Sequence, residues 1–183
     1  MDRIVMISGS PASASRTDTV LNYIGKQFEK RGVRVSTYSV RDLPPGQFFQ
    51  PDYRGEPLHG MLEALSEADG YVIASPVYNL FMTGILKALL DLLPRDVFGG
   101  KPVLPLMIGG TEKHFMALDF ALKPVLAFMK GKPLPGVYLL DRKVDKQAEN
   151  PLPDPDIQRR IERQMDEMFQ MIKDKRCKDM KGS

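Results

Sequence analysis

Short apolar runs alternate with amphipathic stretches along the chain, and this alternation constrains the fold more strongly than any other sequence feature. Apolar runs of about four to eight residues are typical of buried strands, whereas apolar residues three and four apart are typical of helices. The predicted strands are 4–7, 33–40, 71–74, 103–108 and 137–140. The predicted helices lie at 20–28, 61–65, 85–93, 112–130 with a kink at Pro124, and 157–172.

Because strands that are separated by helices run parallel, this order predicts an α/β fold with helices on both faces of the sheet. Five such strands fit a flavodoxin-like three-layer α/β/α fold, with a five-stranded parallel sheet in the order 2-1-3-4-5. The 183 residues suit a single domain over 1–183. The Pro- and Gly-rich residues 42–58 are predicted to form a long loop.

The composition excludes several classes of protein. The only cysteine, Cys177, cannot form an internal disulfide, which favours a reducing, cytoplasmic setting. No apolar run is long enough to span a membrane, and the apolar start of the chain is too short for a signal peptide. The net charge of +3, without tryptophan or interleaved aromatics, argues against nucleic-acid binding. The basic residues 173–183 are interpreted as a solvated C-terminal tail.

The carboxyl ends of the strands are the expected ligand site, because sheets of this kind bind ligands where the strand order reverses, between strands 1 and 3. Three loops are therefore of interest, after Ile7, after Ala74 and after Ile108. Each of them has an ordinary structural interpretation as well as a functional one, and only their combination is informative.

The first loop is rich in hydroxyl groups. It reads Ser8-Gly9-Ser10-Pro11-Ala12-Ser13-Ala14-Ser15-Arg16-Thr17. A helix N-terminus attracts phosphate, hydroxyls add donors, and Arg16 adds a charge-assisted donor. The pattern is neither GxGxxG nor GxxxxGK[ST], which disfavours dinucleotide and P-loop sites. A helix cap would need only one such residue, so four serines, a threonine and an arginine favour a phosphate site.

The second and third loops suit a flat ring. In Ser75-Pro76-Val77-Tyr78-Asn79 the proline stiffens the backbone, Val77 and Tyr78 offer apolar surface, and Asn79 offers a polar edge. In Gly109-Gly110-Thr111 the glycines allow close approach of the backbone, while a turn capped by Thr111 is an equally good interpretation. A phosphate cradle beside a ring support on one sheet edge fits a mononucleotide with a large planar ring, and FMN fits best.

The chain also resembles the NADPH-dependent FMN reductases of flavodoxin-like fold, and most closely the FMN reductases of two-component alkanesulfonate monooxygenase systems. The resemblance runs from residue 3 to about residue 140. The matching motifs are Gly9-Ser10-Pro11 with Ser15-Arg16, Ala68-Asp69-Gly70 leading to Ser75-Pro76-Val77-Tyr78, Gly84-Ile85-Leu86-Lys87 with Leu89-Leu90-Asp91-Leu92-Leu93-Pro94, and Gly109-Gly110-Thr111 with Ala121-Leu122-Lys123-Pro124-Val125-Leu126.

The resemblance implies roles for the three loops. The FMN phosphate would be held by Ser8, Ser10, Ser15, Arg16 and Thr17. The isoalloxazine would be bordered by Pro76, Val77, Tyr78 and Asn79, and its polar edge by Gly109, Gly110 and Thr111. Where those relatives carry a tyrosine beside the flavin of a neighbouring subunit, this chain has Phe120. This departure bears on whether FMN is a diffusible substrate or a prosthetic group.

The implied activity is transfer of a hydride from NADPH or NADH to flavin N5. The cofactors carry this chemistry, so no catalytic side chain is expected, and no metal is required. His59 and His114 have no partners at motif spacing. The reduced flavin could serve a partner monooxygenase. Two alternatives stay open: a flavoprotein reductase of quinone, azo or metal acceptors, and a flavodoxin-type electron carrier.

Self-association is the last expectation from the sequence. Helix 85–93 carries Ile85, Leu86, Leu89, Leu90, Leu92 and Leu93, and is apolar around most of its circumference. Because one stripe faces the sheet and the rest needs cover, a homodimer or homotetramer is predicted, in line with the family. Lys87 and Asp91 are expected to pair within the helix or across an interface.

Overall fold

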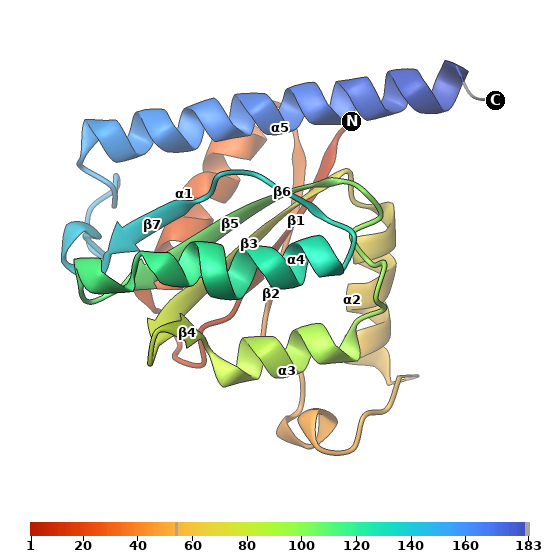
Figure 1. Ribbon diagram of the computed structural model, residues 1–183, viewed down its shortest axis with the longest axis horizontal. Coiled ribbons are helices and arrows are strands. Elements are labelled where there is room, and N and C mark those ends of the chain that lie inside the picture. The colour runs from red at the N-terminus through yellow and green to blue at the C-terminus, as the bar shows by residue number, and fades with distance from the viewer. Residues whose placement is uncertain (54, 182–183) are drawn as a thin grey trace.

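One sheet with five principal parallel strands forms the centre of the computed structural model, which describes residues 1–53 and 55–181 (Figure 1). The principal strands are β1 (Arg3–Ser8), β2 (Arg34–Ser39), β3 (Gly70–Tyr78), β5 (Pro102–Gly109) and β7 (Val137–Leu140). They lie in the order β2-β1-β3-β5-β7, which confirms the predicted order. The two short strands are β4 (Phe81–Met82), antiparallel to β3, and β6 (Lys132–Pro133), parallel to the start of β5.

Helices cover both faces of the sheet (Figure 1). Helices α1 (Arg16–Lys30) and α5 (Pro155–Lys181) pack on one face, and α2 (Glu56–Glu67), α3 (Gly84–Leu92) and α4 (Lys123–Phe128) pack on the other. Successive strand residues point to opposite faces of the sheet. Ile4 and Met6 therefore pack in the apolar cluster with α1 and α5, while Val5 and Ile7 pack in the cluster with α2, α3 and α4. The predicted three-layer α/β/α architecture is therefore confirmed.

The predicted loop 42–58 contains more structure than expected. A short 3-10 turn covers Pro45–Phe48, and α2 begins at Glu56, earlier than the predicted helix 61–65. Pro57 lies in the first turn of α2, where the missing N–H has no partner to lose, so this proline favours a helix start rather than a loop.

The predicted helix 112–130 is divided into three pieces. A 3-10 turn (Glu112–His114) is followed by a π turn (Leu118–Leu122) and then by α4. Lys123 N–H bonds to the Leu118 carbonyl, and Pro124 has no N–H to donate, so the residue before the proline carries the wider π hydrogen bond. The irregularity expected at Pro124 is therefore a change from a π turn to an α-helix just before the proline.

The basic residues that were interpreted as a solvated C-terminal tail form the last turns of α5 as far as Lys181, and residues 173–180 are largely exposed. Arg176 forms ion pairs with Asp2 (2.6 Å) and Asp69 (2.9 Å) at the opposite edge of the sheet from the three loops. Gly182 and Ser183 lie outside the described residues. A further short 3-10 turn (Asp141–Lys143) precedes the connection to α5.

The buried Gln164 fastens α5 to the segment that enters β7. Its side chain accepts from the Gly136 N–H (2.5 Å) and donates to the Gly136 carbonyl (3.1 Å).

Gln164→Leu leaves both backbone groups buried without partners, so the free energy of unfolding should fall by about 2–4 kcal/mol. Urea unfolding followed by circular dichroism measures this change. The exposed Gln170→Leu on the same helix is the control, with a change within about 0.5 kcal/mol; equal losses in the two variants would contradict the prediction.

Candidate functional site

The loop from β1 to α1 is held by its own hydroxyl groups. Ser15 caps α1: its hydroxyl accepts from Asp18 N–H (3.1 Å), and the Asp18 carboxylate accepts from Ser15 N–H (3.2 Å). Ser8 Oγ donates to Asp18 Oδ1 (2.5 Å) and accepts from Ser10 N–H (3.4 Å). The structure therefore brings together Ser8, Ser10 and Ser15. Ser15 Oγ accepts in the cap, while Ser8 Oγ and Ser10 Oγ donate their protons to Asp18 Oδ1 and to the Ala12 carbonyl (3.2 Å), so these two hydroxyls would have to exchange acceptors to donate to a phosphate.

Ser8 and Ser10 are buried, at 2% and 1% exposure, and Ser15 is half-buried. Thr17 is buried in the first turn of α1. Arg16 is exposed, and no ion pair among the described residues involves it.

The cation that does contact the loop is Arg41, just after β2, which falls between the predicted strand 33–40 and the predicted loop 42–58 and was not singled out from the sequence. Arg41 follows the carboxyl end of strand 2, which neighbours strand 1 in the predicted sheet, and this position could have identified it from the sequence as a residue near the first loop.

The predicted second loop is largely strand. Ser75, Pro76, Val77 and Tyr78 continue β3 beyond the predicted 71–74, and β4 pairs back against them in a hairpin. The expectation of a loop was wrong because the hairpin supplies hydrogen-bond partners that a lone strand would lack. Asn79 and Leu80 form the turn with φ of 49° and 64°, as the primed hairpin turns require.

The exposed side of this hairpin is apolar. Ser75 is buried, Pro76 and Val77 are half-buried, and Tyr78 and Asn79 are exposed. Tyr78, Leu80 and Phe81 are 51%, 50% and 43% exposed. A non-glycine residue such as Leu80 at positive φ carries backbone strain, which is commonly retained at ligand sites. The hairpin can therefore present aromatic surface at the edge of the sheet.

Thr83, which the sequence analysis missed, joins the first two loops. Its hydroxyl donates to the Gly9 carbonyl (2.6 Å) and accepts from Leu86 N–H (3.2 Å) as the cap of α3, and its N–H donates to Ser75 Oγ (3.1 Å). Gly9 N–H in turn donates to the Ala74 carbonyl (2.7 Å). A threonine directly before an apolar helix is a cap signal, but its long-range bond to Gly9 depends on the tertiary fold.

The third loop follows β5 and is packed against Tyr138. The Tyr138 hydroxyl donates to the Thr111 carbonyl, and a Cβ on Gly109 would lie 2.1 Å from Tyr138 Oη. Burial, and the nearby Asp141 carboxylate, raise the pKa of Tyr138, so the phenol remains a donor. Thr111 caps the 3-10 turn that follows by accepting from Lys113 N–H (3.3 Å). The packing of Tyr138 therefore requires a glycine at position 109, whereas Gly110 is exposed.

Strand pairing places all three loops at one edge of the sheet. Ser8 pairs in register with Ala74, and Pro76 pairs with Ile108. The arrangement offers hydroxyl and amide donors on one side and an apolar hairpin on the other.

His59 is exposed, and His114 is half-buried with a buried Nδ1 that has no hydrogen-bond partner in the described structure. Within residues 1–53 and 55–181 no group of His, Cys, Asp or Glu is placed to hold a metal ion.

Gly109→Ala tests the packing of the third loop. The added Cβ would overlap Tyr138 Oη, so we expect a loss of about 2 kcal/mol or more in the free energy of unfolding. Urea unfolding measures it, with Gly110→Ala as the control, because its Cβ would have only Asp141 Oδ2 nearby, at 3.7 Å. In a Tyr138→Phe background the alanine should cost less, since the overlapping oxygen is gone. Additive effects of the two substitutions would refute the proposed contact.

Comparison with known proteins agrees with this architecture, which is that of the flavodoxin-like α/β proteins. A structure of an NADH:FMN oxidoreductase superposes with a TM-score of 0.82 at 30% sequence identity, covering 92% of this chain and 88% of that one. Residues 3–145 match the family described as NADPH-dependent FMN reductase. The chain belongs to the NADPH-dependent FMN reductase family.

Two relatives show how far the similarity extends. The FMN reductase (NADPH) of Escherichia coli K12 is 34% identical over 171 residues, covering 93% of this chain and 90% of the relative. The FMN reductase (NADPH) of Pseudomonas putida is 37% identical over 142 residues, covering 77% and 72%. The family match over residues 3–145 spans all three loops. No helix among the described residues is long and apolar enough to cross a membrane.

Proposed function

We propose that this chain is an NAD(P)H-dependent FMN reductase, with the three-loop edge as its flavin site. The observation that carries the proposal is the joining of the hydroxyl-rich loop to the exposed hairpin through Gly9 and Thr83. This joining supports a site in which a phosphate cradle would lie beside a surface for a planar ring. When bound, FMN would accept a hydride from NADPH or NADH and pass electrons on, which is chemistry that the cofactors supply.

The chain's own residues would bind and orient the flavin. The hydroxyls of Ser8, Ser10 and Ser15 at the N-terminus of α1 fit a phosphate, since that helix end also contributes partial positive charge. Thr17 is buried and would support the loop, and Arg16 would contribute charge from the solvent side. To donate to the phosphate of FMN, the Ser8 and Ser10 hydroxyls would exchange their present acceptors, Asp18 Oδ1 and the Ala12 carbonyl, for phosphate oxygens.

The ring and its polar edge would be held by the other two loops. The half-buried Pro76 and Val77 and the exposed Tyr78 and Asn79 would border the isoalloxazine. The backbone of Gly109, Gly110 and Thr111 would face its polar edge. None of these groups needs to gain or lose a proton for a hydride transfer, so removing a single hairpin side chain should weaken flavin binding more than it slows turnover.

NADPH oxidation at 340 nm by the purified protein, with and without added FMN and under air, tests this function. We expect oxidation that rises with added FMN. Oxidation by a yellow protein without added FMN would identify FMN as a prosthetic group, as the missing hydroxyl at Phe120 favours. No consumption of NADPH or NADH at saturating FMN would refute the reductase and leave the carrier role. Parallel assays with quinone and azo acceptors identify the acceptor.

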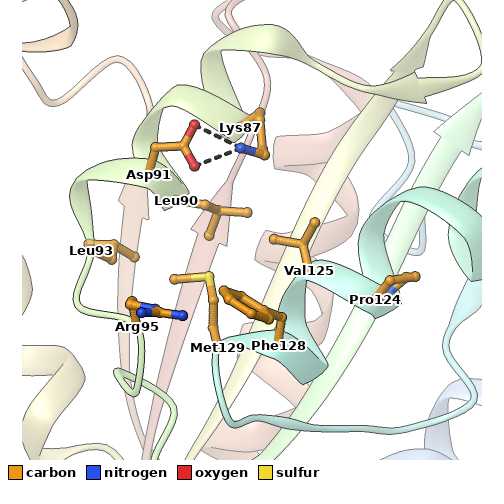
Figure 2. Close-up of a pocket in the computed structure, with 9 residues that line it drawn as sticks. All are labelled: Lys87, Leu90, Asp91, Leu93, Arg95, Pro124, Val125, Phe128 and Met129. Carbon is orange, nitrogen blue, oxygen red and sulfur yellow. Dashed lines mark hydrogen bonds and ion pairs between the residues drawn. The ribbon is translucent and has the colours of Figure 1, made fainter.

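The homo-oligomer remains a proposal, on a different basis from the sequence argument. The leucines of α3 are buried by their own chain, and Lys87 pairs with Asp91 within the helix at 2.6 and 2.8 Å (Figure 2). Exposed apolar side chains lie instead along 115–128. They are Phe115, Met116, Phe120 and Phe128. Several large apolar side chains exposed along one segment favour contact with a second copy, in a homodimer or homotetramer.

Phe128→Asp tests this face. Phe128 is 62% exposed beside a cavity of about 340 Å³ between α3 and α4, with Arg95 stacked 5.3 Å from its ring centroid (Figure 2). A buried carboxylate would destabilise an interface there, so light scattering after size exclusion should show a smaller species than the wild type. Met180→Asp, at the far end of α5, is the control and should keep the wild-type mass. A monomeric wild type would contradict the proposal.

The cellular setting and the final acceptor are also proposed. The exposed, unpaired Cys177 fits a reducing cytoplasm. A flavin-dependent monooxygenase that consumes reduced flavin is the partner that the family resemblance favours.

A further inference from the structure

Arg41 has a fixed place beside the phosphate loop. Val40 N–H donates to the Ser8 carbonyl (3.0 Å), which continues the pairing of β2 with β1. The backbone then turns through two side-chain bonds: Ser39 N–H to Asp42 Oδ2 (2.8 Å) and Arg41 N–H to Ser39 Oγ (3.2 Å). The arginine therefore starts from an ordered turn at the carboxyl edge of the sheet.

The guanidinium spans the loop. Nη1 donates to the carbonyl oxygens of Ser10 and of Ala12, the latter at 3.0 Å. Nη2 donates to Asp18 Oδ2 at 3.0 Å. A planar fork with several donors can satisfy three acceptors at once in a way that a lysine ammonium cannot.

Asp18 creates an electrostatic problem for a phosphate site. Its carboxylate accepts from Ser8 Oγ (2.5 Å) and Ser15 N–H (3.2 Å), so a negative charge lies among the hydroxyls proposed to hold a phosphate dianion. Its side chain is only 16% exposed, which weakens solvent screening. Arg41 supplies the ion pair that Asp18 makes in the described structure.

We propose that Arg41 is the positioning residue of the phosphate loop: its guanidinium neutralises Asp18 and engages the Ser10 and Ala12 carbonyls, so that the loop presents donors to the flavin phosphate. This inference rests on the proposed function, because it assumes that the loop binds FMN. The selectivity for FMN over riboflavin then depends on a residue just after β2, outside the loop itself.

The test compares FMN with riboflavin, which lacks the phosphate. Quenching of flavin fluorescence gives both dissociation constants for the wild type and for Arg41→Ala. We expect Arg41→Ala to weaken FMN binding about tenfold and to leave riboflavin binding within about twofold. The KM for FMN should rise while kcat at saturating FMN stays near that of the wild type. Arg41→Lys should restore part of the FMN affinity, because it returns the charge without the fork.

A second substitution separates neutralisation from direct contact with the phosphate. In the Arg41→Ala background, Asp18→Asn removes the uncompensated charge and should recover FMN affinity. No recovery would overturn the neutralising role. Arg31→Ala is the matched control: Arg31 is on the far end of α1, has similar side-chain exposure (35% against 31%) and pairs with Asp166 at 2.6 Å. It should leave both dissociation constants unchanged.

Other outcomes would separate a positioning role of Arg41 from a purely structural one. An equal loss for FMN and riboflavin in Arg41→Ala, with lower thermal stability, would show a purely structural brace and overturn the inference. Unchanged FMN binding in Arg41→Ala would do the same. If the wild type itself does not prefer FMN to riboflavin, the proposed flavin site fails before this inference is reached.

Discussion

The hydrogen bonds of Gly9 hold the candidate site together. Its N–H donates to the Ala74 carbonyl at the end of β3, and its carbonyl accepts from Thr83 at the start of α3. A Cβ at this position would lie 2.7 Å from Leu86 Cδ2, so the close approach requires glycine. These contacts bring the β1–α1 loop against the β3–β4 hairpin, and the binding and positioning proposed above all depend on that contact.

The charges of the loop follow from the same packing. A helix start that uses Asp18 in a capping box stabilises α1, but it places a carboxylate where a phosphate site needs positive potential. The ion pair from Arg41 reconciles the two requirements, because one side chain offsets the carboxylate and satisfies two loop carbonyls. Stability of the helix and affinity for an anion are therefore linked through a residue outside the loop.

Prediction from the sequence was most successful where a local pattern implies one structure. The five principal strands and their order were predicted, because apolar runs separated by helices leave few parallel arrangements. The boundaries were less accurate where long-range pairing decides. The segment Ser75–Tyr78 was expected to be a loop, since its proline and polar ends hide the pairing with β4. The interpretation of residues 173–183 as a tail did not predict that α5 continues to Lys181, because the ion pairs of Arg176 with Asp2 and Asp69 join residues far apart in the chain.

The candidate site divides along the same line. The amino-acid sequence alone determined that hydroxyls, a proline-aromatic segment and a glycine pair follow three strands, because residue type and spacing are local properties. Only the tertiary structure decided that Arg41, from outside the first loop, bonds to its carbonyls, that Thr83 ties that loop to the hairpin, and that Gly109 makes room for Tyr138. Each of these three contacts joins residues at least 29 positions apart, and such contacts depend on how the strands and helices pack rather than on any local pattern.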